Sequence, residues 1–143
     1  MKQLTKYTWL AAIVLFSFGL QAQEQGYYRS PALHNNDLVF TAGADLWKHD
    51  LSTGTTIRLT TNHGVETDAM ISKDGKWIAF LGQYEGNRDI YVLGINGGIP
   101  RRVTFHESRT NVQGWTDDGQ ILYSTTVHST LPNAQLFKLI QPH

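Results

Sequence analysis

A pattern of short apolar segments recurs along this chain at a spacing of about 44 residues. Its central copy, residues 68–104, predicts four short strands, because Asp74-Gly75 and Asn96-Gly97-Gly98 supply turn residues that tolerate a positive φ. The predicted strands are Asp68–Ser72, Trp77–Gly82, Ile90–Gly94 and Arg101–Thr104. Successive strands joined by tight turns form an antiparallel up-and-down sheet.

The same order of residues stands on both sides of the central copy. Upstream the matching segments are Asp37-Leu-Val-Phe40, Asp45-Leu-Trp47 and Arg58-Leu-Thr60; downstream they are Asp118-Gly119, Ile121-Leu-Tyr123 and Gln135-Leu-Phe137. A period near 44 residues with four strands per unit is typical of β-propeller blades. We therefore predict an all-β chain of about two and a half four-stranded antiparallel blades, an incomplete propeller. A small β-sandwich is the alternative.

These units predict the domain organisation. A partial β-propeller occupies residues 23–143, with blade 1 at about 27–60, blade 2 at about 68–104 and a partial blade 3 at about 111–139. So few blades leave apolar sheet faces and strand edges uncovered. We expect the chain to be the front end of something longer, and to be poorly soluble or self-associating when expressed alone.

The N-terminus has the features of an export signal. Lys2 and Lys6 precede a 12-residue apolar run, Trp9–Leu20, and a small residue, Ala22, stands where signal peptidase would cut. The run is too short to span a bilayer as a helix. We predict a cleaved signal peptide at residues 1–22, no membrane span after cleavage, and a periplasmic or secreted product; a retained membrane anchor is the alternative.

Composition excludes two classes of function. The chain has no cysteine, which rules out a disulfide framework and a thiolate metal site. Its 12 basic residues balance its 12 acidic ones, and no basic cluster exceeds Arg101-Arg102, so binding of nucleic acid is disfavoured.

The motif search predicts no metal site. His106-Glu107 begins like the zinc signature H-E-x-x-H, but Thr110 replaces the second histidine. The remaining histidines stand apart at predicted turns or strand ends; they include His34, His49, His63 and His128.

The search predicts no catalytic or cofactor site either. No G-x-S-x-G motif is present, and Ser72 and Ser124 fall at ordinary strand ends. The adjacent carboxylates of Asp117-Asp118 precede a turn glycine, which favours a structural role over acid–base catalysis. The glycines at 94, 97 and 98 match no phosphate-binding loop.

Two sets of residues recur at blade spacing. Asp45 and Asp89 each precede an apolar-aromatic pair, and we expect them to bind backbone amides within their own blades. Large aromatic residues recur as well, and we expect them to form the core between blades rather than a ligand cage. They are Phe40, Trp47, Trp77, Phe80, Tyr91, Trp115, Tyr123 and Phe137.

The units resemble the PD40 or TolB-type repeat, a WD40-like propeller repeat whose pattern runs roughly S-P-D-G-x-x-I-A-F, then D-I-Y, G-G and R-L-T. Here the pattern stands as Ser72-Lys-Asp-Gly-Lys-Trp-Ile-Ala-Phe80, Asp89-Ile-Tyr91, Gly97-Gly98 and Arg102-Val-Thr104. The resemblance covers nearly the whole mature chain. It implies the fold but not the function, because a fold by itself does not fix a function.

The entry to the first unit is similar to the start of tricorn-type serine proteases, which opens Y-R-x-P-x-I-H, then I-V-F and D-L-W. The matching segments are Gly26–His34, Asp37–Phe40 and Asp45–Trp47. In that family the resemblance implies an N-terminal six-bladed propeller, a second propeller, a PDZ-like domain and a C-terminal serine peptidase core. The family's catalytic residues lie in the C-terminal parts, so none is assigned to a position here.

The resemblance implies a non-catalytic propeller segment of an exported tricorn-like serine peptidase, which contributes substrate access, filtering or assembly to peptide hydrolysis. Its expected partners are peptide substrates or a protein partner and the remainder of a larger peptidase, with a homo-oligomer as a further possibility. The alternative is a TolB-like exported protein-binding propeller module. A cytoplasmic location is the alternative if the parent protein follows the archaeal tricorn pattern.

Overall fold

The computed structural model describes residues 27–105, 107–127, 129–130 and 133–140; the predicted signal peptide lies outside these ranges. All regular structure in the described residues is β-strand. The strands are β1 (Tyr28–His34), β2 (Asp37–Ala42), β3 (Asp45–Asp50), β4 (Thr55–Arg58), β5 (Glu66–Ile71), β6 (Trp77–Glu85), β7 (Asn87–Gly94), β8 (Arg101–Arg102), β9 (Thr110–Trp115), β10 (Ile121–Thr125) and β11 (Gln135–Leu139).

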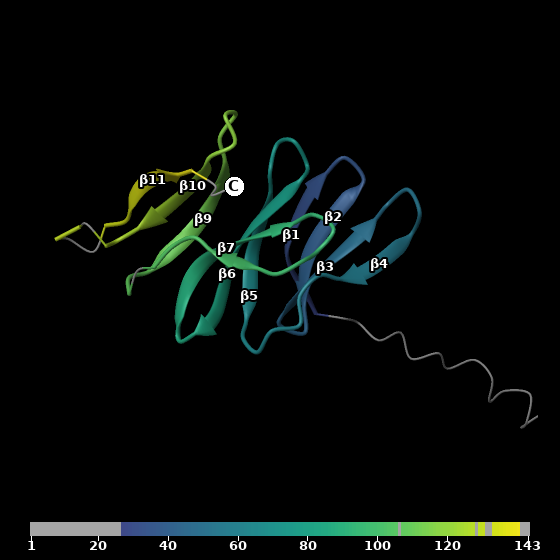
Figure 1. Ribbon diagram of the computed structural model, residues 1–143, viewed down its shortest axis with the longest axis horizontal. Coiled ribbons are helices and arrows are strands. Elements are labelled where there is room, and N and C mark those ends of the chain that lie inside the picture. Colours follow the sequence, from purple (N-terminus) through teal and green to yellow (C-terminus); the bar gives the residue numbers. More distant parts are fainter. Residues whose placement is uncertain (1–26, 106, 128, 131–132, 141–143) are drawn as a thin grey trace, which may run out of the picture.

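The strands form three antiparallel sheets in chain order, and we call each sheet a blade. Blade 1 is β1-β2-β3-β4, blade 2 is β5-β6-β7-β8, and blade 3 is β9-β10-β11. Figure 1 shows the blades side by side with blade 2 in the middle. This arrangement confirms the predicted class of successive antiparallel blades that do not close into a ring, and it differs from a two-layer sandwich.

Blade 2 is covered on both faces, and its sequence reflects this. Ile78 and Phe80 on β6 point to blade 1, whereas Ala79 and Leu81 point to blade 3, and all four side chains are buried. A strand buried on both faces has no polar face, so its residues form a continuous apolar run instead of alternating.

Two apolar clusters hold the blades together. The cluster between blades 1 and 2 consists of Val39, Leu46, Leu59, Ala69, Ile78, Phe80, Tyr91 and Leu93. The cluster between blades 2 and 3 consists of Ala79, Leu81, Ile90, Val92, Val103, Val112, Ile121 and Tyr123. In each cluster the earlier blade contributes aliphatic side chains, and the later blade contributes its large aromatic ones.

The predicted Asp-Gly turn forms between β5 and β6. Gly75 has φ +72°, a conformation that favours glycine, and its N–H donates to Ser72 O at 2.9 Å. The Asp74 carboxylate accepts from the Ser72 hydroxyl at 2.6 Å and from the Lys76 N–H at 3.1 Å. The hydroxyl bond is the largest cause of the lowered pKa of Asp74.

Among the four strands predicted for the central copy, β6 and β8 end furthest from the predicted residues. Strand β6 continues past Gly82 to Glu85, so the hairpin with β7 is longer than expected, and the Gln83 amide closes its tip by donating to Gly86 O at 2.9 Å. Strand β8 is shorter than predicted, because a side chain replaces the main chain in its hydrogen bonding with β7. The Ile90 N–H donates to the Thr104 hydroxyl at 2.8 Å instead of to a main-chain carbonyl.

The three blades converge at their first strands. Strands β1, β5 and β9 are each the edge strand of their sheet, and β5 contacts both β1 and β9. We call these three strands the inner edge. The inner edge corresponds to the part of a propeller that surrounds its central channel.

Candidate functional site

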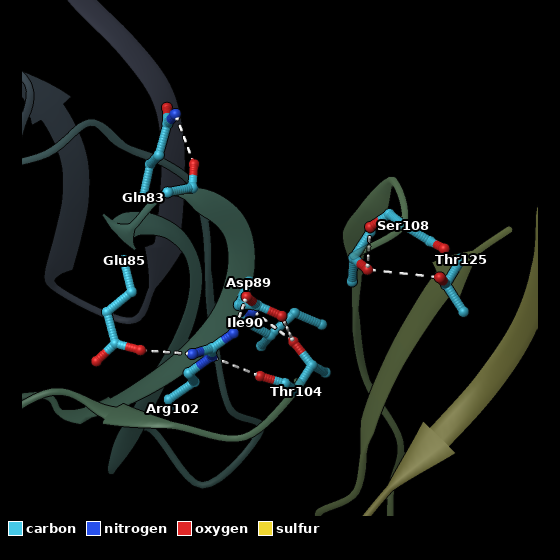
Figure 2. A network of polar contacts seen from close by, with 10 residues as sticks. Gln83, Glu85, Asp89, Ile90, Arg102, Thr104, Ser108 and Thr125 are labelled. Carbon is cyan, nitrogen blue, oxygen red and sulfur yellow. Dashed lines mark hydrogen bonds and ion pairs between the residues drawn. The ribbon is translucent and has the colours of Figure 1, made fainter. Parts of the chain in front are cut away.

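A network of an aspartate, an arginine and a threonine joins the third and fourth strands of blade 2 (Figure 2). The Arg102 guanidinium contacts Asp89 at 2.6 Å and Glu85 at 2.6 Å. The Thr104 hydroxyl donates to Asp89 at 2.9 Å and accepts the Ile90 N–H. These charged and hydroxyl groups therefore bind partners within blade 2.

Blade 1 repeats this network at the matching positions. The Arg58 guanidinium lies 2.5 Å from Asp45, and the Leu46 N–H donates to the Thr60 hydroxyl at 2.9 Å. Each aspartate thus bonds within its own blade, as expected, but its partners among the described residues are side chains rather than backbone amides. Asp45 pairs with an arginine, and Asp89 pairs with an arginine and accepts from a threonine. In both blades the threonine hydroxyl accepts the backbone N–H. A group that recurs in blades 1 and 2 stabilises each of these blades rather than forming one shared site.

The described histidines lie apart from one another. The His34 ring lies against the turn at Gly75, and His49 Nδ1 is 2.8 Å from the Thr56 hydroxyl. His63 lies in the connection between β4 and β5, whereas His106 and His128 fall outside the described residues. Within the described ranges, no three histidine or carboxylate side chains are placed to hold a metal ion.

The serine and aspartate candidates make bonds that fit structural roles. The Ser72 hydroxyl accepts the Trp77 N–H at 3.0 Å, and the Ser124 hydroxyl accepts from the Gln113 amide at 3.0 Å. Asp117 pairs with Lys73 of the neighbouring blade, and Asp118 accepts from the Gln120 amide at 2.7 Å. These are turn and strand-end bonds, and none of the four side chains hydrogen-bonds to a histidine within the described residues.

The inner edge carries a feature that the sequence analysis missed. Strands β1, β5 and β9 each contain a β-bulge. The bulges of β1 and β5 lie opposite Phe40 and Phe80, and the bulge of β9 leaves Gln113 between the residues paired with Leu122 and Tyr123. In the first two bulges a non-glycine residue has a left-handed φ, +48° at Ser30 and +55° at Asp68. Such backbone costs about 1–3 kcal/mol per residue and is often found at functional sites.

Polar side chains meet at these bulges. The Ser30 hydroxyl donates to Asp68 at 3.2 Å across the two blades, and the Thr67 hydroxyl donates to Asp68 at 2.9 Å. The Arg88 guanidinium lies 3.6 Å from the Asp68 carboxylate, and both side chains remain about half exposed. The inner edge therefore presents accessible polar groups between blades 1 and 2.

An aromatic pair recurs across the second and third strands of every blade. The pairs are Phe40 with Trp47, Phe80 with Tyr91, and Tyr123 with Phe137. In blades 2 and 3 the preceding blade packs against the pair. In blade 1 the pair instead lines an open recess of about 880 Å³.

We call this surface of blade 1 the open aromatic face. Phe40 packs edge-to-face against Tyr28 with ring centroids 5.2 Å apart, and the Trp47 indole N–H donates to Ala42 O at 3.0 Å. Tyr27 and Tyr28 are 77% and 65% exposed. The rings are therefore held in place while much of their surface remains free to contact another molecule, as at protein interfaces.

The described residues thus provide two contact surfaces, the inner edge and the open aromatic face. Among the described residues, no helix is long and apolar enough to cross a membrane.

Comparison with known proteins agrees with this geometry. Residues 25–142 match the family model described as the tricorn protease N-terminal beta propeller domain. A putative tricorn-like protease N-terminal subunit from Sulfurisphaera tokodaii is 37% identical over 113 residues, which are 76% of this chain and 57% of that protein.

Solved structures show the same arrangement of blades. A crystal structure of the tricorn protease superposes with a TM-score of 0.72 and 26% identity, over 79% of this chain and 12% of that one. TolB from Acinetobacter baumannii superposes with a TM-score of 0.65 and 22% identity, over 79% of this chain and 29% of that one, which shows a shared fold. The chain thus spans only part of the proteins that it matches.

The family model covers all of the described residues, and the blade order, the repeated aromatic pairs and the tricorn structure agree with it. The chain therefore belongs to the family of tricorn protease N-terminal β-propeller domains, as an incomplete propeller of three blades.

Proposed function

We propose that this chain is a non-catalytic propeller segment of a larger, exported tricorn-like serine peptidase, in which it contributes to assembly and to the access of peptide substrates. The observation that carries the proposal is the aromatic pair of Phe40 and Trp47, which occupies the position that neighbouring blades cover in blades 2 and 3.

The covered pairs indicate what should pack on the open aromatic face. Val39, Leu46 and Leu59 of blade 1 cover the pair of blade 2, and an aliphatic face of blade 2 covers the pair of blade 3. The expected occupant is therefore another blade of the same enzyme that presents small and aliphatic side chains. Burial of its apolar area would provide the main driving force.

The inner edge supports a role in substrate access. An edge strand normally offers main-chain groups to any extended chain, and a β-bulge interrupts that pairing. The bulges in β1, β5 and β9 would let a peptide pass along the inner edge without joining the sheet. Asp68 and Arg88 would supply polar side-chain contacts to such a peptide.

Export is part of the proposal and rests on the predicted signal peptide at residues 1–22. A periplasmic or secreted enzyme would meet peptides outside the cytoplasm. A second candidate is a TolB-like protein-binding module, because the exposed tyrosines of the open aromatic face are also suited to a separate protein partner.

Immunoblotting of fractionated source cells tests the proposal, with an antibody raised against residues 23–143. We expect a band many times larger than a 143-residue chain in the exported fraction. Its immunoprecipitate should hydrolyse peptides and lose that activity when treated with a serine-directed reagent. A band of the size of this chain, without peptidase activity, would reject the proposal and favour the binding module.

A further inference from the structure

Glu66 lies at the start of β5 with its side chain fully buried between blades 1 and 2. Its carboxylate accepts the Leu46 N–H of blade 1 at 3.0 Å. It also contacts the hydroxyls of Thr60, in the connection between the blades, and Tyr84 of blade 2. One carboxyl group therefore joins three elements from both sides of the junction.

The junction supplies no cation to this carboxylate. Within the described part of the chain, no basic side chain forms an ion pair with Glu66, and the Arg58 guanidinium is bound to Asp45. Asp45 lies close enough to add repulsion, and His63 lines the same outer recess as Tyr84. Burial raises the pKa of Glu66, and the donated hydrogen bonds offset this only in part.

The next junction shows a different arrangement of the same parts. There the Thr104 hydroxyl donates to Asp89 of its own blade, and Thr110 stands at the position that matches Glu66. In the first junction the Thr60 hydroxyl instead contacts Glu66. The junction between blades 1 and 2 is thus built around an additional ionisable group.

We propose that Glu66 is a proton-operated latch: blades 1 and 2 are held together when its carboxyl group is protonated, and its ionisation loosens their contact. In the protonated form the Glu66 O–H donates to the Thr60 oxygen, and the Thr60 hydrogen turns to Asp45, as that of Thr104 does to Asp89. In the ionised form a buried charge lacks a cation, and opening the junction hydrates it. The proton is exchanged with solvent.

The direction of the pH effect follows from linkage. The closed junction binds the Glu66 proton more tightly than the open one, in which the carboxyl group has an ordinary pKa. The opening equilibrium constant therefore rises with pH between the two pKa values, by at most tenfold per pH unit, and is constant outside them. The latch is closed at the acidic end of this window.

Amide hydrogen exchange in the full chain measures the opening directly. The reporter is the Leu46 N–H, which donates to the Glu66 carboxylate. The control is the N–H of Val92, whose side chain packs between blades 2 and 3, away from Glu66. Protection factors are corrected for the intrinsic rise of exchange with pH. We expect the protection factor of Leu46 to fall as pH rises through the window, by at most tenfold per pH unit, while that of Val92 changes much less.

Two variants separate the latch from simple structural loss. E66Q carries a neutral amide that imitates the protonated acid, and should give high Leu46 protection that no longer depends on pH. Y84F removes a donor but keeps the carboxyl group, and should retain the pH slope. An unchanged slope in E66Q, or equal slopes at Leu46 and Val92 in the unmodified chain, would overturn the latch.

A second measurement keeps the proposal testable if E66Q fails to fold. The chain contains four glutamates, Glu24, Glu66, Glu85 and Glu107. In a carboxyl-carbon NMR titration of the unmodified chain, the Glu66 resonance should have its midpoint above the ordinary range for a glutamate. The E85Q spectrum assists the assignment. A Glu66 midpoint in the ordinary range would refute the latch.

Discussion

Replacing Phe80 with alanine should destabilise the chain strongly, whereas the same change at Phe40 should have a small effect. The two residues occupy the same position in successive blades, each opposite a large aromatic partner on the next strand. Phe80 is fully buried between blades 1 and 2, whereas Phe40 lines the recess of the open aromatic face. The pair therefore isolates the effect of a covering blade.

The expected size of each effect follows from burial. Removing a fully buried phenylalanine ring loses its transfer free energy and leaves a cavity, so Phe80→Ala should lower the free energy of unfolding by about 3–5 kcal/mol. The Phe40 ring is partly solvated and its neighbours can relax into the recess, so Phe40→Ala should cost about 1 kcal/mol.

Urea denaturation of the chain, followed by tryptophan fluorescence, measures both values. Sedimentation at the same protein concentrations must show a monomer, because a second copy covering the open aromatic face would change the result. In a larger peptidase that contains this segment, the cost of Phe40→Ala should rise towards that of Phe80→Ala. Equal costs in a monomeric chain would refute the assignment of this face as uncovered.

Three further substitutions test the packing. Asp89→Asn removes a buried charge from its ion pair with Arg102, which is 24% exposed, and should cost about 3 kcal/mol in urea denaturation. The control Asp45→Asn should cost about 1 kcal/mol, because its partner Arg58 is 44% exposed. The reverse order would contradict the burial argument. Thr41→Val should raise the free energy of unfolding by about 1 kcal/mol, because the Thr41 hydroxyl is buried without a partner among the described residues; a loss would indicate a bond to water. Gly75→Ala should cost about 1–2 kcal/mol, because alanine is strained at φ +72° and its Cβ would lie 2.8 Å from the His34 ring. Adding His34→Ala should recover only the steric part of this cost. Full recovery in the double variant would show that the backbone is not strained.

The strand order and the turns could be predicted because their causes are local. Asp74-Gly75 specifies a tight turn through the conformational freedom of glycine and the short bond from Ser72 to Asp74. The repeat then places an aromatic pair in each blade. These signals depend on residues that are close in the sequence, so one chain was enough to predict successive antiparallel blades.

The open aromatic face and the latch could not be read in the same way. Phe40 and Phe80 look equivalent in the repeat, and only the packing shows that one is covered by a neighbouring blade and the other is not. Glu66 looks like a surface residue beside a turn, because Leu46 and Tyr84, which surround its carboxyl group, come from two different blades.

The sequence by itself determined the period, the turns and the order of the strands within each blade. Tertiary structure decided which faces are buried, where the inner edge is bulged, and which carboxyl group lies between blades. The physical reason is that hydrogen bonds of a strand and its turn form between near neighbours, whereas burial and the pKa of a buried acid depend on the neighbouring sheet.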